Sequence, residues 1–249
     1  MTTSCSAKSG DSFTPGNYQI SCSVTDSQSH TASCSFSVDV AVAPIPMLSV
    51  TKFLGFGDSE TEGKIGQSPF QLLPASYTIK LESMLRARYT EQTIVVANDG
   101  SGGQQAEDPG TLDRFDHALE REKPEVVLLM DGANDLIDRL DDGVDPAIKA
   151  LSTMGSHAAG KGVFVFLATI PPMKPNHAGA GSVPSLNAKI AALASSRSWP
   201  LVDVYAAFNG DLGLIGSDGL HPTDAGYQLV AQTFYDRIVA KLEAQPATR

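Results

Sequence analysis

The sequence lacks an apolar run long enough to cross a membrane, and it has no excess of basic residues. A membrane helix needs about 20 consecutive apolar residues, whereas the longest run, 163–168, has the length of one buried strand. The 249 residues include 18 Lys and Arg against 28 Asp and Glu, for a net charge of −10. Nucleic acids and anionic membranes require clustered Lys and Arg. The composition therefore argues against either as the main partner.

Cysteine is scarce and confined to the start of the chain. Cys5, Cys22 and Cys34 are the only three, and none follows them. This asymmetry indicates two modules, and cysteines in a β segment favour an oxidising, secreted or periplasmic location. Residues 1–5 nevertheless lack the basic start and apolar core of a secretory signal, so either a leader is missing from this sequence or the protein stays inside the cell. No close Cys-x-x-Cys pair supports a metal site.

Residues 17–24 and 32–40 alternate polar and apolar side chains around the polar stretch 26–30. This pattern predicts a β-hairpin. Cys22 and Cys34 lie nearly symmetrically about the turn and can face each other, while Cys5 competes for either partner. The sequence leaves the disulfide pairing open.

Four stretches of this segment resemble the end of a bacterial immunoglobulin-like repeat of the HYR type: Cys5, 10–16, 22–26 and 34–38. The resemblance covers only about 40 residues of the ≈ 100 in a complete sandwich. We therefore interpret residues 1–43 as a truncated immunoglobulin-like β segment. Because a lone hairpin is marginal in water, we expect it to pack on the second domain, to form a dimer through an edge strand, or to be poorly ordered. Residues 44–50, with Pro44 and Pro46, are expected to be a linker.

Strand and helix patterns alternate across the second domain, 51–243, which a short tail, 244–249, follows. The expected strands are 52–56, 93–97, 126–130, 163–168 and 201–204, and the expected helices are 76–89, 112–123, 146–159, 185–196 and 224–242. Such alternation predicts an α/β fold whose five-stranded parallel sheet is covered by helices on both faces. Ligands of such sheets bind beyond the carboxyl ends of the strands.

Four blocks carry residues suited to acyl transfer: 57–59, 98–103, 132–135 and 218–222. The reaction needs a nucleophile, a base, a group that orients the base, and donors for the oxyanion. Ser59 can be the nucleophile, His221 the base and Asp218 its orienting acid. The backbone N–H groups of Ser59 and Gly103 and the side-chain amide of Asn134 can form the oxyanion hole.

Each block also has an ordinary structural interpretation. Glycine-rich loops are usually turns, Gly-x-Asn-Asp suits a helix N-cap, and Asp-x-x-His-Pro suits a helix start with an exposed histidine. The order of the blocks, and the position of the first three directly after expected strands, favours the catalytic interpretation.

These blocks are similar to those of the SGNH hydrolase superfamily, the GDSL-type esterases and lipases, over residues of about 50–243. The resemblance implies a flavodoxin-like three-layer α/β/α sandwich, a catalytic triad of Ser59, His221 and Asp218, and oxyanion donors at Ser59, Gly103 and Asn134. The asparagine that precedes the glycine donor by five residues in the family matches Asn98. No Gly-x-Ser-x-Gly motif occurs, which argues against the α/β-hydrolase fold.

Two positions depart from the family pattern. Glu60 follows the nucleophile where many relatives carry an apolar residue. An inward carboxylate there would disfavour anionic substrates, and an outward one would have no effect. The glycine loop also contains Gly102, a second candidate for the donor.

We predict no metal and no cofactor. Asp113 and His117 lie one helical turn apart, as in a metal pair, but we favour a solvated helix face. The acidic residues Asp135, Asp138, Asp141, Asp142 and Asp145 are likewise expected on a solvated surface.

The expected substrate is a small, short-acyl ester. Leu214, Ile215 and Leu220 surround the histidine block and are candidates for an acyl pocket, and the loop 171–183 is expected to overhang the site. The closest alternative is a carbohydrate deacetylase acting on acetylated polysaccharides. A second alternative is a non-catalytic extracellular binding or adhesion protein, against which the intact set of site residues argues.

Overall fold

The structure is a computed structural model that describes residues 2–41, 45–66 and 76–244, in two compact units, Met1–Ile45 and Pro46–Arg249. The predicted linker, 44–50, spans the division between them, and residue 44 lies outside the described residues, as does all but the first residue of the predicted tail. Leu48 is buried in the core of the larger unit and forms a β-bridge with Glu243. The segment just before the parallel sheet is therefore part of the larger unit.

The smaller unit is an antiparallel sheet of three strands, β1 (Thr2–Cys5), β2 (Gly16–Thr25) and β3 (Thr31–Val40), in the order β1-β2-β3. The predicted hairpin corresponds to β2 and β3. Its turn is held by Asp26, whose Oδ1 accepts hydrogen bonds from the backbone N–H groups of Gln28 and His30, at 2.8 and 2.9 Å. The third strand, β1, was not predicted, because four residues are too few to establish an alternating pattern.

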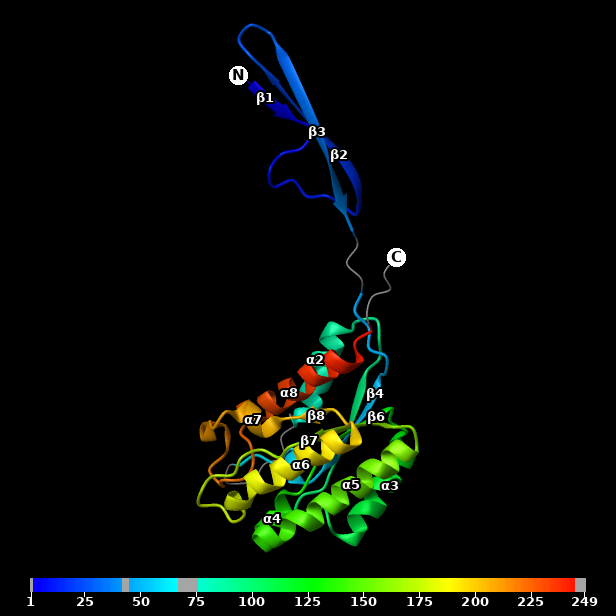
Figure 1. The fold of residues 1–249 in the computed structure, drawn as a ribbon, viewed down its shortest axis with the longest axis vertical. Helices are drawn as coiled ribbons and strands as arrows, with labels where there is room; N and C mark the ends of the chain where they lie inside the picture. Colours follow the sequence, from blue (N-terminus) through cyan, green and yellow to red (C-terminus); the bar gives the residue numbers. More distant parts are fainter. Residues whose placement is uncertain (1, 42–44, 67–75, 245–249) are drawn as a thin grey trace. The chain divides into compact units, whose positions relative to one another are not determined.

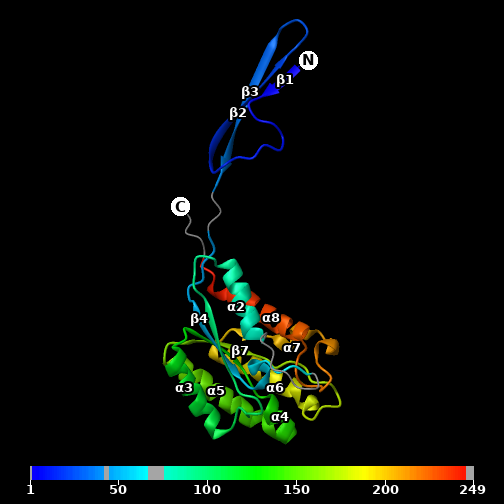
Figure 2. The same ribbon diagram turned by 180° about the vertical axis from the view of Figure 1, so that it is seen from behind.

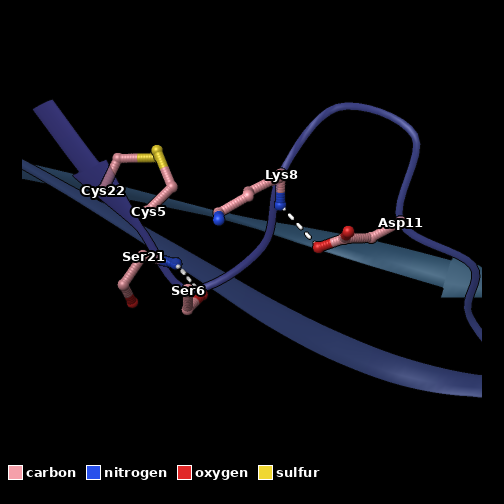
Figure 3. The surroundings of a disulfide bond; sticks show 6 residues. All are labelled: Cys5, Ser6, Lys8, Asp11, Ser21 and Cys22. Atoms are coloured by element: carbon pink, nitrogen blue, oxygen red, sulfur yellow. Dashed lines mark hydrogen bonds between the residues drawn. A yellow bond between two sulfur atoms is a disulfide. The ribbon is translucent and has the colours of Figure 1, made fainter.

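The three cysteines form one row across this sheet, since Cys5 pairs with Cys22 and Cys22 pairs with Cys34 in the strand register. A disulfide joins Cys5 to Cys22 (Figure 3), and Cys34 is free and exposed. Beside the disulfide, the backbone N–H of Ser21 donates to Oγ of Ser6, at 3.1 Å. The disulfide thus ties the short strand β1 to β2.

The two faces of this sheet differ in polarity. The even-numbered positions of β2 and β3 carry apolar or cysteine side chains apart from Gly16, and the odd-numbered positions are mostly Ser, Thr, Asn and Gln. Ile20 is buried and Tyr18 contacts Phe13, at 4.8 Å between ring centroids. Phe36, in contrast, is 53% exposed. Part of the apolar face is therefore uncovered within this unit.

The larger unit is built on a sheet of five parallel strands, in agreement with the expected α/β class. The strands are β4 (Lys52–Gly57), β5 (Val95–Gly100), β6 (Val126–Met130), β7 (Phe164–Ala168) and β8 (Leu201–Val202), in the order β5-β4-β6-β7-β8. All five residues of β6 are buried. The continuous apolar run of β6 reflects a strand covered on both faces.

Helices cover both faces of this sheet (Figures 1 and 2). On one face lie α2 (Tyr77–Arg88) and α8 (Asp224–Leu242), and on the other lie α3 (Pro109–Glu122), α5 (Val144–Gly160) and α6 (Val183–Arg197). The short helices α1 (Ser59–Glu62), α4 (Ala133–Arg139) and α7 (Val204–Phe208), and the 3-10 turns η1 (Leu140–Gly143), η2 (Ala180–Ser182) and η3 (Leu212–Leu214), were not predicted. Within the described residues, no helix combines the length and hydropathy that a membrane crossing requires.

The strand order creates a switch point at β4. The chain passes from β4 to β5 on one side and then returns to β6 on the other. Connections that leave neighbouring strands in opposite directions open a crevice at their carboxyl ends. The segments that follow β4, β5 and β6 meet at this crevice.

Candidate active site

Ser59 lies in a tight turn directly after β4. Asp58 is the N-cap of α1, and its Oδ1 accepts a hydrogen bond from the backbone N–H of Glu60, at 2.9 Å. Gly57 allows this turn to lie against β6, because a Cβ there would come within 1.9 Å of the backbone oxygen of Met130. The serine is thereby held at the rim of the sheet, 4% exposed.

His221 lies just before α8, in a loop that is held by backbone hydrogen bonds between its own residues. Ile215 and Pro222 form a β-bridge, and the backbone N–H of Gly216 donates to the oxygen of His221, at 2.8 Å. Thr223 then caps α8 by accepting a hydrogen bond from the N–H of Gly226, at 3.2 Å. These backbone contacts fix the position from which the imidazole projects.

The structure brings Ser59, His221 and Asp218 into one hydrogen-bonded chain. Nε2 of His221 lies 2.8 Å from Oγ of Ser59, and Nδ1 lies 2.5 Å from Oδ2 of Asp218. Oδ1 of Asp218 accepts from the backbone N–H groups of Leu220 and His221. Burial opposes the charged form of Asp218, but the hydrogen bonds from His221 and Leu220 outweigh it and lower the pKa of this carboxyl. Asp218 therefore stays ionised beside the imidazole.

The predicted oxyanion donors lie in segments that meet at this rim. Gly103 has a φ of +82°, a left-handed conformation that favours glycine, and a Cβ there would meet no atom within 4 Å. Gly102, in contrast, is packed, because its Cβ would come within 2.0 Å of Nζ of Lys64. Nδ2 of Asn134, in α4, donates to the backbone oxygen of Gln104, at 3.0 Å. Of the two glycines, Gly103 is the one with open space around it.

Asn98, in β5, connects the serine helix to the start of α2. Its Nδ2 lies within hydrogen-bonding distance of the backbone oxygen of Thr61, at 2.7 Å, and of the hydroxyl groups of Ser76 and Thr78. Its Oδ1 accepts from the N–H of Gly100, at 2.9 Å. An asparagine at this position therefore holds α1 against the sheet.

Three carboxyl groups are buried beneath the site. Burial raises the pKa of Asp58 to about 6, and it raises the pKa values of Glu60 and Asp131 well above their usual range, with repulsion from neighbouring carboxylates adding to each shift. Glu60 is 2% exposed, so its side chain points inward. Burial and the neighbouring carboxylates therefore disfavour the charged form of Glu60, which weakens the expected electrostatic discrimination against anionic substrates.

Asp135 was expected on a solvated acidic surface, and for this residue the expectation is wrong. It is fully buried, and its two carboxylate oxygens accept hydrogen bonds from the backbone N–H groups of Ala106 and Glu107, at 2.8 and 3.1 Å. It thus fixes the loop that leads from β5 to α3. Across the described ranges, no group of three metal-ligating side chains is assembled.

The predicted acyl-pocket residues lie under the histidine loop. Ile215 and Leu220 are 2% and 8% exposed and belong to the hydrophobic core, and Leu214 packs against it. Their packing supports the loop, and an acyl-pocket role for them stays a prediction. In the loop 171–183, the N–H of Lys174 donates to the backbone oxygen of Gly219, at 2.8 Å. This loop therefore contacts the segment that carries Asp218 and His221.

Comparison with known proteins adds to this geometry. Residues 56–229 match the model of the GDSL-like Lipase/Acylhydrolase family. The chain belongs to this family. Membership in the GDSL-like family makes the protein a hydrolase of the lipase/acylhydrolase type. No curated protein matches the chain.

Solved structures of similar fold cover nearly their whole length. The lipase/acylhydrolase from Enterococcus faecalis is 25% identical, with a TM-score of 0.67 over 79% of this chain and 100% of that one. LAE5, an alpha/beta hydrolase enzyme from the metagenome of Lake Arreo in Spain, is 23% identical, with a TM-score of 0.65 over 77% and 96%. Axe2, an acetylxylan esterase from Geobacillus stearothermophilus, is 24% identical, with a TM-score of 0.63 over 76% and 94%. The last two likenesses concern the fold alone.

Proposed function

We propose that this GDSL-family protein is a serine esterase that hydrolyses small, short-acyl carboxylic esters. The observation that carries the proposal is the hydrogen-bonded chain from Asp218 through His221 to Ser59, with 2.5 and 2.8 Å between the joined atoms. This arrangement supplies a nucleophile, a base and a group that orients the base.

In the acylation step, Oγ of Ser59 attacks the ester carbonyl carbon while Nε2 of His221 takes the hydroxyl proton. The imidazolium that forms is stabilised by the Asp218 carboxylate at Nδ1. Negative charge develops on the carbonyl oxygen, where the N–H groups of Ser59 and Gly103 and the amide of Asn134 would stabilise it. The C–O bond to the alcohol then breaks, and His221 returns the proton to the leaving oxygen.

Deacylation repeats these steps with water. Nε2 of His221 takes a proton from water as the oxygen attacks the acyl carbon. The tetrahedral intermediate collapses with cleavage of the bond to Oγ of Ser59, and the proton passes back to Oγ. The products are the carboxylic acid and the free serine.

A fluorophosphonate probe and p-nitrophenyl acetate test the proposal together. The parent protein should be labelled and should turn over the ester, whereas Ser59→Ala should do neither while it keeps its thermal transition. His221→Ala should abolish most turnover, since no other described side chain lies at Oγ to take the proton. A parent protein that is neither labelled nor active would favour the non-catalytic binding protein.

The acyl preference is a separate part of the proposal. Ile215 and Leu220 are buried in the core, and Leu214 alone of the three predicted acyl-pocket residues is partly exposed, which supports a short acyl group. Hydrolysis of p-nitrophenyl acetate should exceed that of the long-chain laurate ester. Equal kcat/KM for the two esters would refute the preference.

A carbohydrate deacetylase is the second candidate function, and the fold likeness to an acetylxylan esterase is the observation that favours it. Acetate release from acetylated xylan and pectin, compared with simple acetate esters at equal acetyl concentration, distinguishes the two. We also propose a secreted or periplasmic location, which the Cys5–Cys22 disulfide supports.

A further inference from the structure

Arg114, on α3, makes hydrogen bonds to three separate segments at the rim of the sheet. Its Nη2 donates to the backbone oxygen of Gly57, at 2.9 Å, and its Nε donates to Oε1 of Gln104, at 2.6 Å. Its Nη1 donates to the backbone oxygen of Asp99, at 2.6 Å, and to the carboxylate of the same residue. One guanidinium thus joins the ends of β4 and β5 to the loop that follows β5.

These segments are the ones that carry the proposed oxyanion donors. Gly57 lies two residues before Ser59, and Gln104 directly follows Gly103. The backbone oxygen of Gln104 accepts the hydrogen bond from the amide of Asn134. The donors at Ser59 and Gly103 are therefore connected to Arg114 along the chain, through Gly57 and Gln104. The donor at Asn134 is connected to it through the hydrogen bond to Gln104.

The guanidinium is held in one orientation. It lies over the ring of Phe56, at 3.9 Å from the ring centroid, and the side chain of Arg114 is only 21% exposed. Phe56 is fully buried and meets Phe115 edge-on. The stacking restricts the guanidinium plane, and its fork of N–H groups then requires the accepting oxygens to lie in that plane.

We propose that Arg114 is a positioning residue that sets the relative placement of the oxyanion donors. The inference rests on the proposed esterase function. Donors aimed in advance at the developing charge lower the barrier because they need no reorganisation during the reaction, and small displacements of reacting groups are costly. In this role Arg114 acts through the donors and not on the substrate. A lysine, with a single nitrogen, cannot reach all three segments from the same backbone position.

The test compares Arg114→Lys and Arg114→Met with a matched control, Arg121→Met. Arg121 also pairs with Asp99, but it is 57% exposed and makes no contact with Gly57 or Gln104 among the described contacts. For both Arg114 variants we expect kcat for p-nitrophenyl acetate to fall by about 10–100-fold, with KM within about twofold. Arg121→Met should stay within about twofold of the parent in both constants, because an exposed ion pair contributes little.

A second readout separates positioning from general weakening of the fold. An aryl trifluoromethyl ketone adds to the serine and forms an oxyanion, so its Ki should rise by the same factor as kcat falls. Gln104→Leu removes the Nε contact alone, and we expect a smaller loss of about 3–10-fold in kcat. This variant keeps the inference testable if Arg114→Met does not fold.

Several results would overturn the inference. Unchanged kcat in a folded Arg114→Met variant, a loss confined to KM, or a loss of kcat without weaker ketone binding would each do so, as would full activity in Gln104→Leu if Arg114→Met is unfolded. A parent protein without Ser59-dependent turnover would instead refute the proposed function, and this inference with it.

Discussion

Nδ2 of Asn134 donates a hydrogen bond to the backbone oxygen of Gln104, at 3.0 Å. A carboxamide nitrogen has two N–H groups, so one can fix the side chain while the other is available to an oxyanion. Asn134→Ala should therefore lower kcat by about 10²–10³, with little change in KM. Steady-state kinetics with p-nitrophenyl acetate check this. A loss of only a few-fold would assign Asn134 to the capping of α4 instead.

Asp218→Asn should lower kcat by about 10⁴, because the amide cannot stabilise the imidazolium and favours the wrong imidazole tautomer. The parent activity should also fall toward acidic pH, because general-base catalysis requires a neutral base. Because hydrogen bonds lower the pKa of Asp218, its carboxylate stays ionised throughout that fall. The pH profile of kcat/KM should therefore show one acidic limb. A profile in which two protons inactivate the enzyme cooperatively would contradict this.

Asp58→Asn should stabilise the protein at neutral pH. Burial raises the pKa of Asp58 to about 6 from an ordinary 3.8, so the folded state binds the proton more tightly than the unfolded state. The free energy of unfolding therefore falls as the pH rises from about 4 to 6, and it stays lower at higher pH. Ionisation of Asp58 thus lowers the free energy of unfolding by up to about 3 kcal/mol near pH 7. Urea unfolding at pH 4.5 and pH 7.5 should show a larger gain for the variant at the higher pH, and an equal or smaller gain would contradict the assignment.

We propose that the N-terminal unit self-associates weakly through its apolar face. No even-numbered position of β2 or β3 is charged, and Phe36 is exposed. The three strands, of four, ten and ten residues, offer a face of about 380 Å², so two copies would bury roughly 760 Å², less than a stable specific interface and in keeping with weak association. Sedimentation should show a concentration-dependent dimer that Phe36→Ser weakens and that Ser35→Asp, on the opposite face, leaves unchanged. A parent protein that is monomeric at roughly 200 µM would contradict this.

The regular parts of the larger unit could be predicted because local sequence determines them. Helix α8 has the predicted bounds, Asp224–Leu242, since Thr223 caps it and its apolar residues keep helical spacing. The candidate site could be predicted for a different reason: its four blocks follow strand ends or precede a helix, and the carboxyl ends of parallel strands converge.

The features that could not be predicted depend on contacts between distant segments. Helix α1 is one turn long and exists because Asp58 caps it against β6, which no periodicity signals. An arginine within a polar stretch of α3 is typical of a solvated face, and only the fold brings Arg114 to Gly57 and Gln104. Asp135 belonged to an acidic run, and its burial depends on the N–H groups of a loop about 30 residues earlier.

The row of cysteines in the N-terminal sheet has a practical consequence. Since Cys22 is bonded to Cys5, Cys34 is the sole free thiol of the chain, and it is exposed. The hydrolase unit contains no cysteine. A maleimide dye or a solid support can therefore be attached at a single defined atom, outside the domain that carries the chemistry.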